Sequence, residues 1–216
     1  MRKRLFCAVL ALVMLFSTQS TAAASNHRST VINATCRLPV IRVIIPPSGS
    51  VYINPFNLPV SINGQSEDTQ IVSSRGRIAN KSDVALDVDV TVTGAVKQGS
   101  TMSLAASPTG GTGTVKSAFV YFEIHQANDS DYDLMNWDSE FDAAKHIVVT
   151  AGVPITKKEI MTLPAMTIDK EVAPGGYALF RLSGDAVRYP TDAWTSNDGI
   201  VVTIAFTFTP LSYTDN

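Results

Sequence analysis

Apolar and polar residues alternate along much of the chain. In residues 84–93, one face carries Val84, Leu86, Val88, Val90 and Val92, and the other carries Ala85, Asp87, Asp89, Thr91 and Thr93. Residues 200–209 repeat the pattern, with Ile200, Val202, Ile204, Phe206 and Phe208 on one face. Because successive side chains of a strand point to opposite faces, both segments are predicted to be strands with one buried and one solvated face.

Residues 117–125 follow a different pattern, because apolar side chains stand on both faces. Phe119 and Tyr121 share one face, and Val120 and Phe122 share the other. Such a strand is either central and covered on both sides, or it lines a binding surface. Further strands are predicted from β-branched and aromatic content at 40–45, 50–54, 69–80, 146–150, 159–168 and 177–183.

Turn signals separate these segments. They include Asn63-Gly64, Asp198-Gly199 and the glycine-rich residues 107–114, which are interpreted as a hairpin loop. Helical periodicity is weak and confined to 137–146 and 190–194. Many short strands with frequent turns predict an all-β fold, an antiparallel β-sandwich that is Ig-like or jelly-roll-like, with one or two short helices.

The first 24 residues have the layout of a secretory signal peptide. Arg2, Lys3 and Arg4 precede an apolar run of 12 residues (5–16), and small residues follow, with cleavage expected after Ala24. The run is shorter than the roughly 17–25 residues of a membrane-spanning helix, so an uncleaved anchor is the weaker interpretation. The protein is expected to be secreted, extracellular or at the cell surface.

The remaining chain is interpreted as a flexible leader (25–39), a single sandwich domain (40–211) and a short tail (212–216). Of the two cysteines, Cys7 leaves with the signal peptide, so Cys36 has no intrachain disulfide partner. The net charge of −2 becomes more negative once the three positive charges near the N-terminus are removed. An acidic chain without a basic patch does not favour nucleic acid or anionic membrane as a partner.

The acidic residues 128–140 are a candidate calcium site. Asp129, Asp131, Asp133 and Glu140 occupy positions 1, 3, 5 and 12 of a loop with EF-hand spacing, but Leu134 stands where that loop needs glycine. From Ser117 to Ala144 there are seven acids and no lysine or arginine, and a cation would relieve their repulsion. The alternative is a solvated turn, with Asp138 or Ser139 capping a short helix and Trp137 and Phe141 packing beneath it.

The sequence contains no G-x-S-x-G or H-E-x-x-H motif, and a non-enzymatic role is expected. His125 and His146 flank the acidic segment and approach each other if their strands pair; the alternative is that each is an ordinary surface residue of its strand. Trp137 and Trp194 lie in turn-rich segments, where they either contact a ligand or plug an open end of the sandwich.

The segments "IANKSDVALDVDVTV" and "VAPGGYALFRLSG" resemble the layout of Ig-like domains in exported bacterial surface and biofilm-matrix proteins. The resemblance covers about a third of the chain, transfers no site residue and implies a structural role at the surface. Two hypotheses follow. The first is a structural or interaction protein that contacts cell-surface or matrix proteins and self-associates through strand edges. The second is a module that binds glycan or surface polymer, assisted by calcium.

The apolar residues 40–45, near the N-terminus, bear on self-association. They either pack within their own subunit as an ordinary first strand, or leave their own sheet and pair with the edge strand of another subunit.

Overall fold

Two sheets pack face to face in the described part of this chain. The computed structural model describes residues 41–46, 48–62, 65–67, 69–109, 115–131, 133, 135–166, 172–173, 175–187 and 194–211. All of these residues belong to one unit, Leu38–Asn216.

The larger sheet has the strand order β1-β6-β12-β9-β10, with β8 also paired to β9. Its strands are β1 (Val43–Ile44), β6 (Gly76–Asn80), β8 (Ser103–Leu104), β9 (Ser117–Ala127), β10 (Ile147–Val148) and β12 (Tyr177–Ala186). The smaller sheet has the order β11-β7-β13, from β11 (Ile155–Leu163), β7 (Leu86–Val96) and β13 (Ile200–Pro210). Apart from the parallel β8–β9 pair, all pairings in the two sheets are antiparallel, which confirms the predicted all-β antiparallel sandwich.

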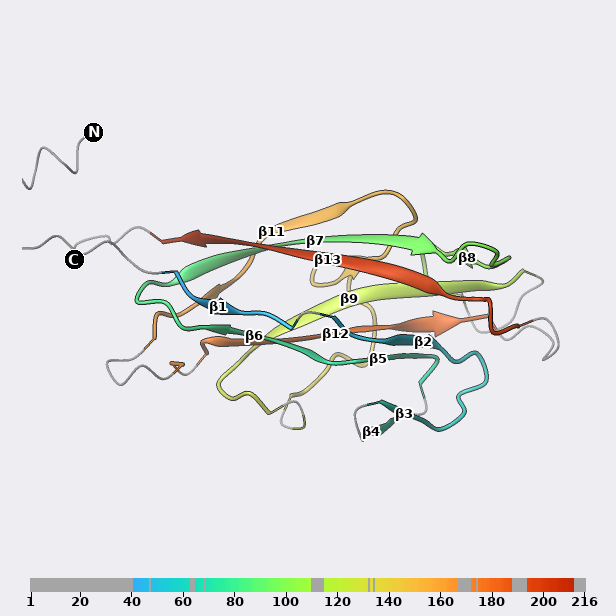
Figure 1. Ribbon diagram of the computed structural model, residues 1–216, viewed down its shortest axis with the longest axis horizontal. Coiled ribbons are helices and arrows are strands. Elements are labelled where there is room, and N and C mark those ends of the chain that lie inside the picture. Colours follow the sequence, from blue (N-terminus) through green and yellow to red (C-terminus); the bar gives the residue numbers. More distant parts are fainter. Residues whose placement is uncertain are drawn as a thin grey trace, which may run out of the picture. The chain divides into compact units, whose positions relative to one another are not determined.

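Two small antiparallel pairs extend the larger layer (Figure 1). They are β2 (Val51–Ile53) with β5 (Ile71–Ser73), and β3 (Val60–Ile62) with β4 (Gln65–Glu67). The Ser73 hydroxyl donates to the carbonyl of Leu182 and accepts from the N–H of Leu182, so β5 is fastened to β12.

The core lies between the sheets and follows the predicted alternation. Val84, Leu86, Val88, Val90 and Val92 are at most 3 % exposed. Phe122 of β9, Phe180 of β12 and Phe206 of β13 join the layers, with ring centroids 5.6 Å apart for the first pair and 5.3 Å for the second. The inward row of β13 differs from that of β7, because Val202, Ile204, Phe206 and Phe208 are only half-buried.

Several sequence predictions need correction. The described residues include no α-helix, and residues 137–146, predicted to be weakly helical, form bends and turns. Of the second weakly helical segment, only Trp194 is described. No helix in the described part of the chain is long and apolar enough to cross a membrane. Residues 107–114 were interpreted as a hairpin loop, but β8 and β9, the strands on either side, run parallel.

The predicted strand 40–45 is shorter than expected and packs in its own chain. Val43 pairs with Asn80 and Ile44 with Ala79, so β1 forms one edge of the larger sheet. This arrangement is the ordinary first strand of the two alternatives. The predicted strand 69–80 is split into β5 and β6 at Ser74 and Arg75.

Candidate functional site

The outer face of the larger sheet carries a row of side chains from β9. Tyr121, Glu123 and His125 alternate with core residues along this strand, and Arg181 and Ser183 stand beside them on β12. The chain between β9 and β10 returns over this face, where Phe141 packs on Phe119 with a centroid distance of 5.0 Å and on Tyr121 at 5.2 Å. The strand with apolar residues on both faces is therefore central and covered.

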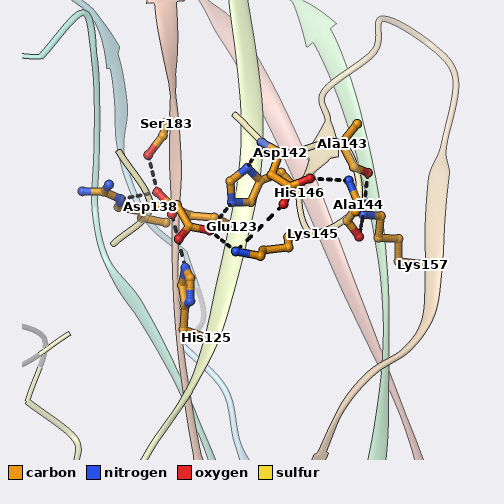
Figure 2. Close-up of polar contacts among 11 residues, drawn as sticks. Glu123, His125, Asp138, Asp142, Ala143, Ala144, Lys145, His146, Lys157 and Ser183 are labelled. Atoms are coloured by element: carbon orange, nitrogen blue, oxygen red, sulfur yellow. Dashed lines mark hydrogen bonds and ion pairs between the residues drawn. The ribbon is translucent and has the colours of Figure 1, made fainter. Parts of the chain in front are cut away.

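Glu123 is the centre of a buried polar cluster (Figure 2). Its side chain has no solvent exposure. One carboxylate oxygen accepts hydrogen bonds from Arg181 Nε and the Ser183 hydroxyl, and the other lies 3.3 Å from His125 Nε2. The Arg181 guanidinium also stacks on Trp137, 4.7 Å from the ring centroid. Trp137 of the covering segment thus packs on the ion pair that joins β9 to β12.

The protonation state of Glu123 follows from these contacts. Burial of the carboxyl acts to raise its pKa, but hydrogen bonds from His125, Ser183 and Arg181, together with the charge of Arg181, outweigh burial and lower the pKa of Glu123 to about 2. Glu123 is therefore a carboxylate at neutral pH. A permanently ionised, fully paired carboxylate is a poor general acid or base, which needs a pKa near the working pH.

His146 lies beside this cluster, as the pairing of β9 with β10 predicts. Its Nδ1 accepts a hydrogen bond of 2.9 Å from the backbone N–H of Asp142, and its Nε2 lies 3.1 Å from the Asp138 carboxylate. Because a backbone N–H always donates, Nδ1 is unprotonated and Nε2 donates to Asp138. Burial lowers the pKa of His146, although the negative charges of Glu123 and Asp138 act to raise it.

Glu123, His125 and His146 form the group that resembles a metal site in the described part of the chain. One possible ligand atom from each lies within 4.8 Å of the others. A histidine that binds a metal through one ring nitrogen donates a proton from the other. His146 Nδ1 accepts instead, so Nε2 has no lone pair for a metal. The Arg181 guanidinium on Glu123 adds a repelling charge. The three side chains fit a hydrogen-bonded cluster better than a metal centre.

Three of the four predicted calcium residues have other partners. Asp129, Asp131, Asp133 and Glu140 are exposed, and none belongs to the group of possible ligands found among the described residues. Asp129 accepts from the Ser130 N–H, Asp131 accepts from the Asp133 N–H, and Asp133 forms an ion pair with Arg75 at 3.4 Å. These contacts favour the turn interpretation, and calcium binding here stays a prediction.

Four of the seven acids between Ser117 and Ala144, namely Glu123, Asp133, Asp138 and Asp142, pair with a lysine or arginine that lies outside this segment. Arg181 of β12 pairs with Glu123, Arg75 with Asp133, and Lys145 Nζ lies 3.6 Å from Asp138. The unrelieved repulsion expected from the local sequence is therefore reduced by partners that the fold supplies.

The two tryptophans are half-buried. Trp137 packs between Arg181 and His125, with its ring centroid 5.4 Å from that of His125. Trp194 packs against the core, and Lys116 Nζ lies 5.9 Å from its ring centroid. Both tryptophan rings pack against other side chains of the protein, and contact of either ring with a ligand stays a prediction.

A hollow of about 380 Å³ beside His125 and His146 is lined by lysines. Lys157 donates to the carbonyls of Ala143 and Ala144, and Lys145 pairs with Asp138 and Asp142 (Figure 2). Burial lowers the pKa of Lys157. Because two of its three lysines hold the covering segment, this hollow is a less favourable ligand site than its composition implies.

A larger groove, of about 620 Å³, lies along β13. One wall is the inward row of β13, from Ile200 to Phe206, and the other is formed by residues 45–46, 48–52 and 73–76. Phe180 and Leu182 of β12 also line it. Figure 1 shows β1 and β2 following one another along the side of β13 that faces away from β7.

The backbone of β13 has a free edge in the described structure, because the sheet ends at this strand. Lys97 N–H donates to Gly199 and Leu211 N–H donates to Ala85, so odd-numbered residues at both ends of β13 bond to β7. The β7–β13 register is continuous, and bonding alternates along an antiparallel strand. The backbone N–H and C=O groups of the even-numbered residues therefore point away from β7, toward the free edge. The side chains of these same residues face the groove.

Glu123, Arg181 and the β13 edge were missed by sequence reasoning. A single acid in the otherwise apolar segment "AFVYFEI" is the signal that would have identified Glu123 as a buried, paired carboxylate. Comparison with known proteins found no match to a family model, a curated protein or a solved structure.

Proposed function

We propose that this protein is an extracellular structural or interaction protein that binds an extended polypeptide segment along the free edge of β13. The expected signal peptide supports export. One observation carries the binding role. In β13, the backbone groups of the free edge point away from β7, and half-buried apolar side chains of the same residues face a groove.

The composition of β13 supports this role. Natural edge strands are protected by lysine, by inward charges, by proline or by bulges. The 11 residues of β13 contain no charged residue, and proline occurs only at the last position, Pro210. The outward row is Val201, Thr203, Ala205, Thr207 and Thr209, which offers no charge repulsion either. An added strand would satisfy the backbone groups and cover the inward row at once.

The contrast between β7 and β13 indicates how much surface such a partner would cover. Val88, Val90 and Val92 of β7 have no exposure, whereas their partners in β13, Phe208, Phe206 and Ile204, are half-buried. The missing cover is thus on the side away from β7. Burying apolar surface contributes about 25 cal/mol per Å², so completing this row would stabilise a complex.

The test uses two variants of one residue on the free edge. Val202→Pro removes an outward N–H without breaking a bond to β7, and Val202→Ala shortens the same side chain but keeps the N–H. Size-exclusion chromatography with light scattering and negative-stain imaging of the secreted protein measure assembly. We expect wild type to form oligomers or fibres, Val202→Ala to retain them, and Val202→Pro to weaken assembly at least about tenfold.

Two results would overturn the proposal. One is a wild-type protein that stays monomeric at several hundred micromolar. The other is equal assembly of the proline and alanine variants, which would place the contact away from the β13 edge. Unchanged melting temperatures of both variants would show that the sandwich itself is intact.

A further inference from the structure

We propose that residues 31–38 of a second copy of this chain occupy the β13 groove as an added strand. This inference rests on the proposed strand-accepting role of β13 and names the partner. It assigns the head-to-tail contact to a segment that precedes β1, with β1 remaining in its own sheet.

The sequence of residues 31–38 has the alternation that the groove requires. Ile32, Ala34, Cys36 and Leu38 fall on one face of an extended chain, and Val31, Asn33, Thr35 and Arg37 fall on the other. The first row is apolar and suits the groove-facing side. The second carries the polar residues and suits the solvated side, which continues the outward row of β13.

The length of this segment fits the free edge of β13. Eight residues in extended conformation span about 26 Å. They pair with fewer residues than the 11 of β13, so one donor strand lies wholly along one acceptor strand. Alanine and cysteine in the middle of the apolar row are small, which suits a groove whose floor already holds Phe180 and Phe206.

The direction of the chain selects a second copy over the same chain. Asn80 Nδ2 donates to the carbonyl of Leu163, and Leu163 pairs with Leu86, which in turn pairs with Pro210. Val43, paired with Asn80, therefore lies toward the Pro210 end of β13, and residues 45–46 and 48–52 run along the groove toward Ile200.

A segment that continues backward from Ile41 in this direction leaves the groove at the Pro210 end. To fill its own groove it would have to reverse within residues 39–42, Pro-Val-Ile-Arg. Pro39 is compatible with a turn, but the stretch contains no glycine, asparagine or aspartate, the residues that two-residue turns between paired strands favour. Its two β-branched residues favour extended backbone instead. Reaching forward into a neighbouring molecule needs no reversal.

Cys36 allows a direct test, because it is the one cysteine left after the expected signal cleavage. Val202→Cys, Ile204→Cys and Phe206→Cys each place a second thiol in the inward row of β13, and Thr203→Cys places one on the outward row as a matched control. Residues opposite each other on paired strands have Cα atoms close enough for a disulfide. Each variant is also made with Cys36→Ser, and tagged and untagged copies are mixed before oxidation.

We expect at least one inward variant to form disulfide-linked dimers and longer ladders containing both tags. These species require Cys36, disappear on reduction and are absent for Thr203→Cys. A disulfide within a single chain would overturn the second-copy assignment. Linkage that persists with Cys36→Ser would show β13 paired with itself, and would overturn it as well.

A charge placed in the donor segment gives a second test that leaves the sandwich untouched. Ala34→Asp puts a carboxylate on the groove-facing row, and Asn33→Asp puts the same charge on the opposite row. We expect the first to abolish assembly and the second to preserve it. If Ala34→Asp and Asn33→Asp assemble equally while Val202→Pro still weakens assembly, residues 31–38 are not the added strand. The proposed binding role of β13 would then still hold. A wild type that does not assemble would overturn both.

Discussion

The side-chain amide of Asn80 donates a hydrogen bond of 3.1 Å to the carbonyl oxygen of Leu163 and so joins the two sheets. Asn80 belongs to β6 of the larger sheet and Leu163 to β11 of the smaller one. The same amide donates to Val84 and Pro164, and its oxygen accepts from the Ser82 N–H at 2.9 Å. One fully buried residue therefore sets the turn that leads into β7 and the separation of the layers at this end.

Replacing Asn80 with alanine leaves these buried partners without their hydrogen bonds. Each unsatisfied buried group costs about 1–3 kcal/mol, and some of these groups regain water. We expect Asn80→Ala to lower the free energy of unfolding by roughly 3–5 kcal/mol in urea titrations. The exposed Asn136→Ala is the control and should change it by less than about 0.5 kcal/mol. Equal effects would contradict the assignment.

The strands with one wet face were predictable because their signal is local. Alternation in residues 84–93 and 200–209 depends only on neighbouring residues and the pleat, and β7 and β13 follow it. Asn80 also lies in the segment "IANKSDVALDVDVTV", whose layout was recognised in the sequence. Its role was not, because Leu163 and Pro164, two of the acceptors of Asn80, lie more than 80 residues along the chain.

The candidate site was only partly predictable for the same reason. The approach of His125 and His146 followed from strand pairing, whereas the pairing of Glu123 with Arg181, 58 residues away, left no local pattern. The predicted short helix over 137–146 is absent because Trp137 and Phe141 pack on the sheet and fix the segment as turns. Tertiary contacts override a weak periodicity of this kind.

Removing the charge of Glu123 should destabilise the covering segment. Glu123→Gln leaves the Arg181 guanidinium, whose side chain is 18 % exposed, without its carboxylate. Breaking a buried ion pair by changing one partner costs about 3–5 kcal/mol, and the remaining amide hydrogen bonds reduce this to roughly 2–4 kcal/mol. Chemical unfolding measures the change.

The matched control for Glu123 is Glu140→Gln, an exposed acid of the same segment. Its effect should stay within about 0.5 kcal/mol. The double variant Glu123→Gln with Arg181→Met should recover part of the lost stability, because no unpaired buried charge remains. A double variant that is the sum of the two single variants would contradict the coupling.

The stability of the protein should begin to fall as the pH drops toward and below about 6.5 because of His146. Burial lowers the pKa of its imidazole below the ordinary 6.5, so the unfolded chain binds a proton before the folded one does. The stabilising contribution of neutral His146 is therefore present above the unfolded-state pKa of 6.5. It is lost as the pH falls toward the lower pKa of the folded state. His146→Asn keeps an acceptor for the Asp142 N–H and should flatten this part of the pH profile. An unchanged slope would contradict it.

Glu123 should contribute to a further loss of stability at lower pH. Its pKa is lowered from 4.5 to about 2, so its stabilising contribution is present above 4.5 and is lost as the pH falls from 4.5 toward 2. Thermal unfolding at closely spaced pH values, compared between wild type and Glu123→Gln, should show a steeper decline for wild type in this range. Parallel curves would indicate that Glu123 is not paired as described.

Zinc should not stabilise the cluster of Glu123, His125 and His146. His146 Nε2 carries the proton that it donates to Asp138, since Nδ1 accepts from the Asp142 N–H. We expect equimolar zinc and excess chelator to leave the melting temperature within about 1 °C of each other, because a bound metal would stabilise the folded state by mass action. A zinc-dependent rise that His125→Ala abolishes would show that the ring of His146 reorients to bind metal.

Calcium tests the acidic segment in the same assay. Asp131 already accepts the Asp133 N–H, and Asp133 is paired with Arg75, so a cation would have to displace or share these contacts. Extracellular calcium modules bind in the roughly 10⁻⁴–10⁻³ M range, so 5 mM calcium suffices to fill such a site. If the segment is only a turn, this calcium concentration should not change the melting temperature of wild type or of the double variant Asp131→Asn with Glu140→Gln. A rise confined to wild type, reversed by chelator and absent with magnesium, would instead establish the calcium site that the EF-hand spacing predicts, because only a site built from those carboxylates responds to their removal.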